Sequence, residues 1–475
     1  MRPSYHSPLA ALVHRTPVTA PPEIPLREAV RLMSQHRVGS IIIADPVSSR
    51  PLGIFTIRDL LHRVAAVSCD LDQTLSHVMS ASGLLTLDTQ ATVYEAALLM
   101  ARHGVHHVII VDAAGRVAGV VSQDNIHELQ SGGGKDISAA IREARDMDSL
   151  AAAAGAVRKL AETLLAEGTA AEPLTQLIST LNDHLTVRII ELTQVEFALP
   201  DIEWCWLAFG SEGRFEQTLS TDQDNGLAFA VTADTGIDAA RAALVPFARA
   251  VNERLATCGF PLCKGNIMAG NLELCLSLDE WQARFKGWLA AGNPQALLSA
   301  SIYFDFRPLY GNDGLATKLR AWLLNHIPAA ALFQRLMAEI ALQTAPPLAT
   351  FREFTFDGNR AFPHTLDLKA GGARLFVDAA RILALAAGIA QTGTAQRLRA
   401  LGDTGRLGGE DVAALVDGFF FIQQLRLRAQ QGGSMAGSAN RVDPDSLNEL
   451  DRHVLKEAFR QARKLQERLR LEYRL

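Results

Sequence analysis

The sequence predicts an α+β protein of several domains, with two copies of a small α/β unit, a domain built on a mixed sheet and a C-terminal helical domain. Three observations support this prediction. A segment of about 20 residues occurs twice near the N-terminus, two apolar strand-like segments flank a polar stretch at Gly210, and apolar residues recur at helical spacing toward the end. We therefore predict domains at 1–135, 199–325 and 326–475, with a helical connector at 136–198.

The composition is that of a globular protein that can bury a core in each domain, with 48% hydrophobic and 20% charged residues. A net charge of -5 provides no general attraction to nucleic acid or to an anionic membrane. No apolar run reaches the roughly 18 residues of a membrane span, and 1–18 lacks the apolar core of a signal peptide. We expect a cytoplasmic protein with neither nucleic acid nor membrane as a partner.

The cysteines are few, odd in number and scattered, which is typical of free thiols in a reducing compartment. Neither a Cys-x-x-Cys pair nor a suitably spaced histidine supports Cys258 and Cys263 as zinc ligands. We expect no disulfide framework. The five cysteines are Cys69, Cys205, Cys258, Cys263 and Cys275.

An internal repeat occupies the N-terminal region. The segment 25–45 aligns with 92–112, so that Met33 matches Met100 and Asp45 matches Asp112. Each copy is expected to form an amphipathic helix, a β-branched strand, a turn, a second strand and a closing helix. One such unit cannot cover both faces of its sheet, so we expect the two copies to pack together.

This arrangement resembles a tandem pair of CBS domains, a Bateman module, over about residues 10–130. The resemblance implies an adenosine nucleotide as ligand, with its ribose held by a Thr/Ser-x-x-Asp motif after the last strand of each copy. The first copy has Thr56 and Asp59, whereas the second has Ser122 but Asn125 in place of the aspartate. Thr56 and Ser122 are equally compatible with helix N-caps, and both roles can coexist.

A Gly-rich hinge at 131–136 leads into alanine-rich helical sequence at 137–196. These helices would either transmit a signal from the repeat or mediate dimerisation, and we expect a homodimer. Nothing in them predicts chemistry.

The stretch GSEGRFEQTLSTDQDN begins at Gly210, directly after an apolar segment that predicts a buried strand. A glycine lets the backbone approach a ligand closely, and Ser211 with the amides that follow can cradle phosphate oxygens. Arg214 adds a cation for the same phosphates.

Asp222 and Asp224 lead into a second apolar strand. Residues two apart on a strand point to the same side, so these carboxylates should lie together. Two adjacent carboxylates repel each other unless a cation lies between them. Mg²⁺, which prefers carboxylate and phosphate oxygens, suits that arrangement.

Together these residues resemble the active-site signature of the DNA polymerase β-like nucleotidyltransferases, most closely PII-protein uridylyltransferases and glutamine-synthetase adenylyltransferases. The resemblance implies that Gly210, Ser211, Gly213 and Arg214 bind the triphosphate of an NTP. It also implies Mg²⁺ or Mn²⁺ on the two aspartates.

Such sites need a third carboxylate from a later strand. Asp305 is predicted on the polar face of a strand in SIYFDFRPLYGN and resembles the Asp-x-Arg segment of the adenylyltransferases. Glu273, on a similarly alternating segment, is the alternative. We favour Asp305, which would bind metal and orient or deprotonate the acceptor.

The sequence after about residue 326 resembles the C-terminal helical domain of bacterial proteins that combine CBS pairs with a nucleotidyltransferase. Lys369, Arg374 and Arg381 would face the triphosphate or the acceptor, or lie on a solvated helix face. The His-Asp doublet of the uridylyltransferases' hydrolase domain is absent from the sequence, so the resemblance implies transfer without removal.

We therefore expect transfer of a nucleoside monophosphate from an NTP to a hydroxyl, regulated by the CBS pair. A protein acceptor is implied by the resemblance, with PII-like uridylylation the nearest named activity. The alternatives are a small-molecule nucleotidyltransferase and a non-catalytic nucleotide-binding signalling protein. The base of the donor and the sign of regulation stay open.

Overall fold

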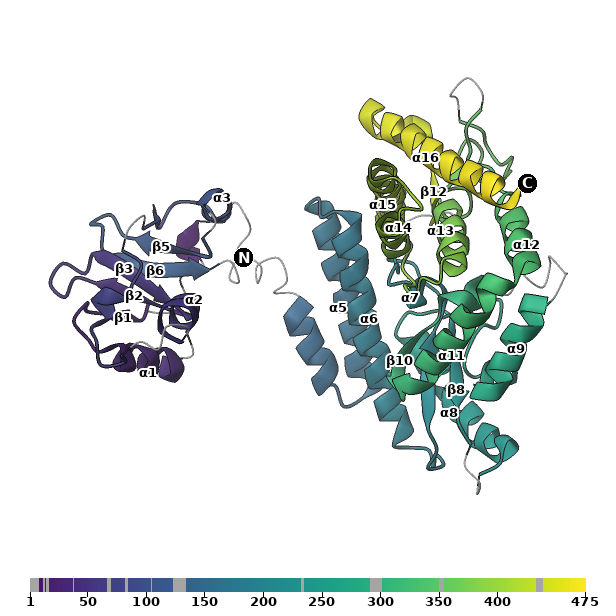
Figure 1. The fold of residues 1–475 in the computed structure, drawn as a ribbon, viewed down its shortest axis with the longest axis horizontal. Helices are drawn as coiled ribbons and strands as arrows, with labels where there is room; N and C mark the ends of the chain where they lie inside the picture. Colours follow the sequence, from purple (N-terminus) through teal and green to yellow (C-terminus); the bar gives the residue numbers. More distant parts are fainter. Residues whose placement is uncertain are drawn as a thin grey trace. The chain divides into compact units, whose positions relative to one another are not determined.

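The computed structural model divides into two compact units, Met1–Lys135 and Asp136–Leu475 (Figure 1). No helix among the described residues is long and apolar enough to cross a membrane. The described residues are 8–11, 13, 17–36, 38–65, 70–81, 84–103, 105–122, 134–231, 235–290, 301–349, 354–432 and 439–475.

The first unit contains two three-stranded sheets with the same topology. In each sheet the central strand pairs in parallel with the strand before it and antiparallel with the strand after it. The first sheet consists of β1 (Thr19–Ala20), β2 (Ser40–Ala44) and β3 (Pro51–Thr56), and the second of β4 (Thr86–Asp88), β5 (His107–Val111) and β6 (Val117–Ser122). The helices of this unit are α1 (Leu26–His36), α2 (Ile57–Asp59), α3 (Val93–His103) and the short turns Leu9–Ala11, Leu60–Ala65 and Leu75–His77.

The burial of equivalent residues on the helices agrees with the predicted repeat. Met33 on α1 and Met100 on α3, which the sequence alignment pairs, are both buried. Each sheet also has its register shift at the equivalent place, before Ala44 in one copy and before Val111 in the other.

The second unit is organised around a four-stranded mixed sheet with strand order β10-β7-β8-β9. The neighbours β10 and β7, and β7 and β8, are antiparallel, whereas β8 and β9 are parallel. The strands are β7 (Trp204–Ala208), β8 (Asn225–Phe229), β9 (Cys275–Ser277) and β10 (Arg307–Gly311).

Helices cover both faces of this sheet, as the alternation of side chains on β7 shows. Trp204 and Trp206 pack in one core cluster with residues of α6 and α8, whereas Cys205 and Leu207 pack in the other with α9, α11 and the C-terminal helices. The helices around the sheet are α5 (Met147–Ala166), α6 (Ala171–Gln194), α7 (Gly210–Gly213), α8 (Ile237–Thr257), α9 (Leu278–Ala290) and α11 (Asp313–His326).

The helices of the predicted connector pack into this unit. Leu185 and Ile189 on α6 are fully buried against α8 residues such as Leu244 and Phe247. These helices therefore form part of the scaffold that surrounds the sheet.

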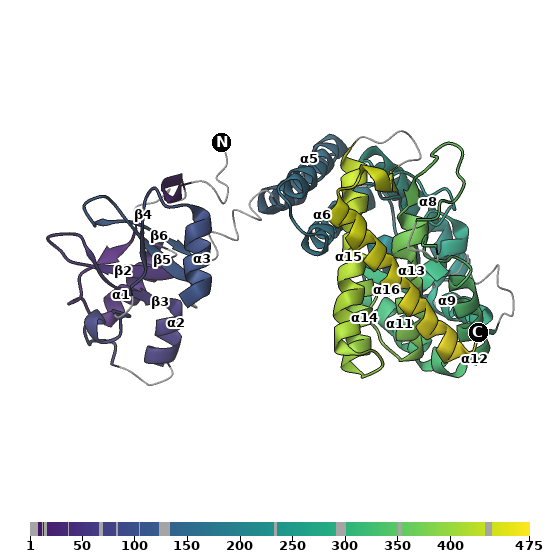
Figure 2. The same cartoon turned by 90° about the horizontal axis from the view of Figure 1, so that it is seen from above.

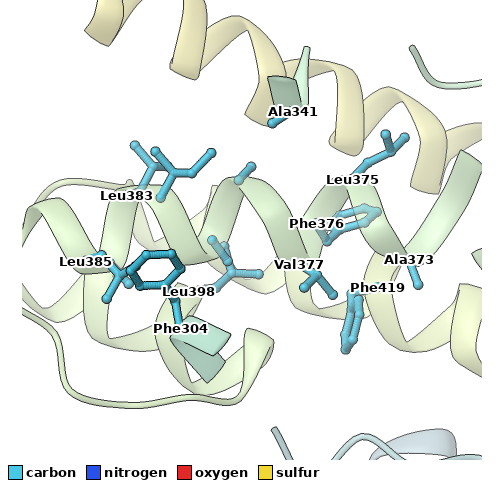
Figure 3. Packing of buried hydrophobic residues seen from close by; sticks show 14 of the residues in the cluster. Phe304, Ala341, Ala373, Leu375, Phe376, Val377, Leu383, Leu385, Leu398 and Phe419 are labelled. Atoms are coloured by element: carbon cyan, nitrogen blue, oxygen red, sulfur yellow. The ribbon is translucent and has the colours of Figure 1, made fainter. Parts of the chain in front are cut away.

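The C-terminal helices continue the core on the side of the sheet that carries Cys205 and Leu207. Figure 3 shows Phe304 lying beside Leu385 and Leu398, while Phe376 lies near Phe419. Helix α16 runs along α13 and α15 (Figure 2). The remaining elements are α12 (Ala331–Ala341), α13 (Arg374–Ala386), α14 (Thr394–Asp403), α15 (Gly409–Gln431), α16 (Glu449–Tyr473), β11 (Leu366–Asp367), its antiparallel partner β12 (Arg441–Val442) and the short turns Leu272–Leu274, Ser301–Asp305, Ile327–Ala329, Lys369–Ala373 and Pro444–Ser446.

Two strand predictions are wrong. Ser301–Asp305 forms a 3-10 turn, and the strand follows it at Arg307–Gly311. Glu273 lies in another 3-10 turn, Leu272–Leu274, directly before β9. Both segments are apolar at alternate positions, but each forms a tight turn from which one apolar side chain, Phe304 or Leu274, is buried in the core.

Candidate active site

The turn α7 and the segment that leads into β8 meet at the end of β7. Ala208 pairs with Asn225 in the sheet, and the Phe209 amide donates a 2.8 Å hydrogen bond to the Asp224 carbonyl. Because β7 and β8 are antiparallel neighbours, the residues after one strand lie beside the residues before the other.

Glycine is required at both ends of the turn. Gly210 has φ +55, and a Cβ on it would lie 2.8 Å from Asp224 Oδ2. A Cβ on Gly213 would lie 1.8 Å from the Asp305 carbonyl oxygen. The two glycines therefore let the turn lie directly against Asp224 on one side and the Asp305 backbone on the other.

The two aspartates come together as the spacing predicts. Oxygen atoms of Asp222 and Asp224 and the Sγ of Cys263 all lie within 4.8 Å of one another. Gln223 points the other way, where its Nε2 donates to the carbonyls of Asn252 and Phe260 at 2.9 and 2.8 Å. These buried amide contacts fix the alternation that presents both carboxylates on one side.

The carboxylate pair carries unbalanced negative charge. Burial and the adjacent Asp222 raise the pKa of Asp224 to about 7, although Cys263, Lys369 and Arg214 partly offset this. Burial and the charges of Asp183 and Asp224 raise the pKa of Glu212, on the same turn, to about 8. A divalent cation would stabilise the ionised form of both aspartates at neutral pH.

Cys263, which the sequence spacing does not support as a zinc ligand, nevertheless lies beside the two aspartates. Its thiol donates a 3.4 Å hydrogen bond to Asp224 Oδ1 from a loop that follows α8. Burial raises the pKa of this thiol, so the residue resembles a neutral donor more than a reactive thiolate. In the sequence, Cys263 begins the polar, Gly-bearing segment CKGNIMAGN, a composition that suits either contact with a nucleotide or a simple turn of the chain.

Ser211 and Arg214, the predicted phosphate ligands, differ in their availability. The Ser211 hydroxyl is half-exposed and makes no hydrogen bond with the described residues. Arg214 is engaged in two ion pairs, from Nε to Glu216 and from Nη1 to Asp305, both at 2.7 Å. The arginine therefore also fixes the conformation of the loop that follows the turn.

Asp305 lies in an entirely different environment from the one predicted. It is fully buried and bonded to three guanidinium groups, with distances of 2.6 Å to Arg381 Nη2, 2.6 Å to Arg397 Nη1 and 2.7 Å to Arg214 Nη1. Burial opposes its ionisation, but the three arginines outweigh that effect and hold its pKa well below the usual range. Because these arginines already occupy both carboxylate oxygens, the assignment of Asp305 as a metal ligand or proton acceptor is corrected to a structural anchor.

Glu273 is also separate from the pair. Its side chain is 73% exposed and pairs with Arg284 at 2.6 Å. Among the described residues, the grouping that could hold a metal contains neither Glu273 nor Asp305.

The three basic residues predicted in the C-terminal region have three different environments. Arg381 is buried on Asp305, and Arg374 is a partly exposed partner of Asp378. Lys369 is exposed, and its charge acts on the pKa of Asp224 against the larger effects of burial and Asp222. Of these three, Lys369 is the one whose charge lowers the pKa of Asp224.

In the first unit, Thr56 and Asp59 form a reciprocal cap at the start of α2. Asp59 Oδ2 accepts from the Thr56 amide and hydroxyl at 2.9 and 2.7 Å, and the Asp59 amide donates to Thr56 Oγ1 at 3.2 Å. The predicted N-cap role of Thr56 is confirmed. Ser122 is the last residue of β6, and Asn125 lies outside the described residues.

Several known proteins are similar to a limited part of the chain. An uncharacterised protein of Methanopyrus kandleri is 27% identical over 119 residues, covering 25% of this chain and 60% of its own length. The CBS domain-containing protein YhcV of Bacillus subtilis is 33% identical over 94 residues, covering 20% and 65%. The chain thus spans less than two thirds of the length of the relatives it matches.

Solved structures also match about a quarter of the chain. A CBS domain protein from Pyrobaculum aerophilum complexed with AMP is 29% identical, with a TM-score of 0.23, and covers 25% of this chain and 88% of that protein. The CBS domain-containing protein ATU1752 from Agrobacterium tumefaciens is 26% identical, with a TM-score of 0.23, and covers 26% and 96%.

Family models account for most of the sequence. The CBS domain matches residues 9–66 and 67–132. The family described as "Putative nucleotidyltransferase DUF294" matches 155–295, and the one described as "Putative nucleotidyltransferase substrate binding domain" matches 331–473. The chain therefore contains a pair of CBS domains, a region of the DUF294 family and a region of the family that forms its C-terminal domain.

Proposed function

We propose that this protein is a metal-dependent nucleotidyltransferase that moves a nucleoside monophosphate from an NTP to an acceptor hydroxyl and releases pyrophosphate. One observation carries the proposal. Asp222 and Asp224 lie on one side of the chain, directly against the glycine turn at Gly210. In-line phosphoryl transfer depends on such positioning and on charge stabilisation more than on covalent chemistry by the protein.

The donor set fits a divalent cation. Two carboxylates beside a neutral thiol attract a cation, and the pKa of Asp224, raised to about 7 by burial and Asp222, reflects the lack of a compensating charge beside it. When bound, Mg²⁺ or Mn²⁺ would neutralise charge on the phosphates and on the attacking oxygen. Mn²⁺ tolerates a sulfur neighbour better than Mg²⁺ does.

The residues of the turn would bind the donor. The free Ser211 hydroxyl and the backbone of Gly210–Gly213 would contact the triphosphate, while Arg214 supplies positive charge nearby. By resemblance to the PII uridylyltransferases, the acceptor is a hydroxyl on a protein.

We further propose that the CBS pair binds an adenosine nucleotide and regulates the transferase. The support is the ordered Thr56–Asp59 cap, in which Asp59 Oδ1 also accepts from Ser80 at 3.3 Å. Such a carboxylate, fixed by its neighbours, would accept hydrogen bonds from ribose hydroxyls. A regulatory ligand of this kind changes activity only by its differential affinity for two states, commonly about 5- to 150-fold.

The catalytic proposal is tested by incubating the full chain with each labelled NTP, Mg²⁺ or Mn²⁺ and a cell lysate. We expect label transfer by the wild type and by Asp201→Asn, which changes an exposed aspartate of the same unit. Asp224→Asn should lose transfer by at least about 10²-fold because the amide cannot anchor the cation. Equal labelling by Asp224→Asn would contradict the assignment.

The regulatory proposal is tested by calorimetry with AMP and ATP on the full chain. Asp59→Ala should lose the dominant adenosine-nucleotide site, whereas Asp72→Ala, an exposed change in the same unit, should retain it. Two equivalent sites, or unchanged binding in Asp59→Ala, would contradict this part of the proposal.

A further inference from the structure

One buried arginine of the second unit forms no ion pair with any carboxylate in the described part of the chain. Arg426 on α15 is only 7% exposed, and its guanidinium donates to two neutral side-chain oxygens, those of Asn440 and Gln423. Its Nη2 makes no hydrogen bond with the described residues and is not among their fully enclosed polar atoms. A buried guanidinium without an acid is costly unless an anion can reach it.

The other buried arginines are already used. Arg381 and Arg397 are both paired with Asp305. Arg320, whose pKa is also lowered, donates to the carbonyls of Phe304 and Phe306 and covers a Phe306 ring at 3.9 Å. Of the buried arginines Arg381, Arg397 and Arg426, Arg426 is the one that forms no ion pair among the described residues.

Hydrogen bonds place Arg426 next to the segment that carries the aspartates. Gln430, one helical turn further along α15, accepts from the Ser220 amide at 3.1 Å and donates to Asn440 at 3.2 Å. Ser220 is two residues before Asp222. Burial lowers the pKa of Arg426 to about 10, with Arg214 contributing and Asp367 and Glu216 opposing, so this guanidinium lies within electrostatic range of the Arg214 loop.

The same asparagine joins Arg426 to the backbone next to Lys369. Asn440 Oδ1 accepts from Arg426 Nε at 3.0 Å, and the Asn440 carbonyl accepts from the Leu368 amide at 2.9 Å. Lys369, the next residue, is exposed, has no ion-pair partner among the described residues and acts on the charge of Asp224. These hydrogen bonds bring Arg426 and the backbone next to Lys369 to Asn440, and Gln430 links Asn440 to the segment that carries the aspartates.

We propose that Arg426 and Lys369 form a phosphate-binding subsite that the C-terminal helical region contributes to the active site. The planar guanidinium would donate its open Nη2 hydrogens to a phosphate oxygen, and the ammonium would add a mobile point charge. The phosphate would come either from the outer part of the NTP donor or from a phosphorylated acceptor. The choice between these two sources rests on the proposed nucleotidyl transfer, but the subsite itself does not.

The test measures binding of inorganic tripolyphosphate to the full chain by calorimetry in EDTA at fixed ionic strength, where no turnover can occur. We expect Arg426→Gln to weaken binding at least tenfold, because it removes charge-assisted hydrogen bonds, and Lys369→Gln to weaken it about threefold or more. Arg428→Gln is the matched control, since Arg428 lies on the same helix, is about half-exposed and pairs with Asp451. It should bind within about twofold of the wild type.

If Arg426→Gln fails to fold, Lys369→Gln and the charge-retaining Arg426→Lys keep the test decisive. Tripolyphosphate binding that is absent in the wild type, or equal in Lys369→Gln and the wild type, overturns the proposal. A parallel loss of affinity for a non-hydrolysable NTP assigns the subsite to the donor. Unchanged NTP affinity with weakened tripolyphosphate binding assigns it to a phosphorylated acceptor, and both results uphold the subsite even if Asp224→Asn shows no catalytic defect.

Discussion

Asp224 and Asp305 are both buried at the same end of the sheet, yet their surroundings are opposite. Asp224 lies beside another carboxylate and a thiol, and burial and Asp222 raise its pKa to about 7. Asp305 lies among three arginines, which overcome burial and lower its pKa far below the usual range. A carboxylate of the first kind attracts a cation from outside, whereas one of the second kind already has its cations.

The cluster around Asp305 has a structural role. The arginines of the Asp305 cluster come from the loop after α7, from α13 and from α14, so this buried charge network joins the C-terminal helices to the glycine turn. Thr392 and the Thr394 amide reinforce the junction by donating to the Gly213 carbonyl and to Glu216 at 2.7 and 2.6 Å. The structural cluster thus fixes the turn that lies against Asp224.

Replacing Asp305 by asparagine should have the largest effect on stability. The amide leaves Arg397 as a buried cation without a balancing charge and removes one of the two carboxylate partners of Arg381, and breaking such a network costs about 3–5 kcal/mol. Chemical denaturation followed by tryptophan fluorescence measures this, because every tryptophan lies in the second unit, namely Trp204, Trp206, Trp281, Trp288 and Trp322.

The control is Glu339→Gln, which breaks an exposed pair with Arg335 and should change the free energy of unfolding by less than about 1 kcal/mol. A stability of Asp305→Asn within that range would mean that the arginine cluster is not structural.

In the absence of metal, replacing Asp224 by asparagine should instead increase the folding stability at pH 8. The pKa of Asp224 is raised to about 7 by burial and Asp222, against about 3.9 in the unfolded chain, so the folded protein holds a proton that the unfolded protein releases. Wild-type stability in EDTA should therefore fall as the pH rises from about 4 to 7, and Asp224→Asn lacks this loss.

We expect the variant to be more stable than the wild type by about 1–3 kcal/mol at pH 8 and nearly equal to it at pH 4. Mg²⁺ should raise the melting temperature of the wild type at pH 8 but not that of the variant. Destabilisation by Asp224→Asn at pH 8 would show that this carboxylate already has its counter-ion within the fold.

The sequence predicted features that depend on neighbouring residues much better than features that depend on distant ones. Strand periodicity was enough to place Asp222 and Asp224 on one side, and the repeat alignment was enough to pair Met33 with Met100. The partners of Asp305 are 76 and 92 residues away on separate helices, and Cys263 is 39 residues from Asp224. A local sequence pattern does not show which distant charges the fold brings to a carboxylate. The structural carboxylate of Asp305 was therefore predicted as a metal ligand.

Gly210→Ala should displace the carboxylate of Asp224, which lies directly against this glycine. A left-handed φ of +55 and a Cβ 2.8 Å from Asp224 Oδ2 make alanine unfavourable by about 1–2 kcal/mol. The displaced carboxylate should also reduce the stabilisation by Mg²⁺. Gly155→Ala is the control, since it lies in the interior of α5 with open space around it and should stabilise by up to about 1 kcal/mol. Equal effects of the two changes would mean that the turn does not lie against Asp224.

The smallest effect is expected at Glu273, the other acidic residue considered as a third metal ligand. Its carboxylate is 73% exposed and its partner Arg284 is partly exposed, so the ion pair between them contributes about 0–1 kcal/mol. Glu273→Gln should keep the stability, the Mg²⁺-dependent rise in melting temperature and the transfer rate close to those of the wild type. A tenfold loss of transfer with unchanged stability would place Glu273 with Asp222 and Asp224 in the presence of substrate. Asp305 would then contrast with three carboxylates that act on the substrate, namely Asp222, Asp224 and the exposed Glu273.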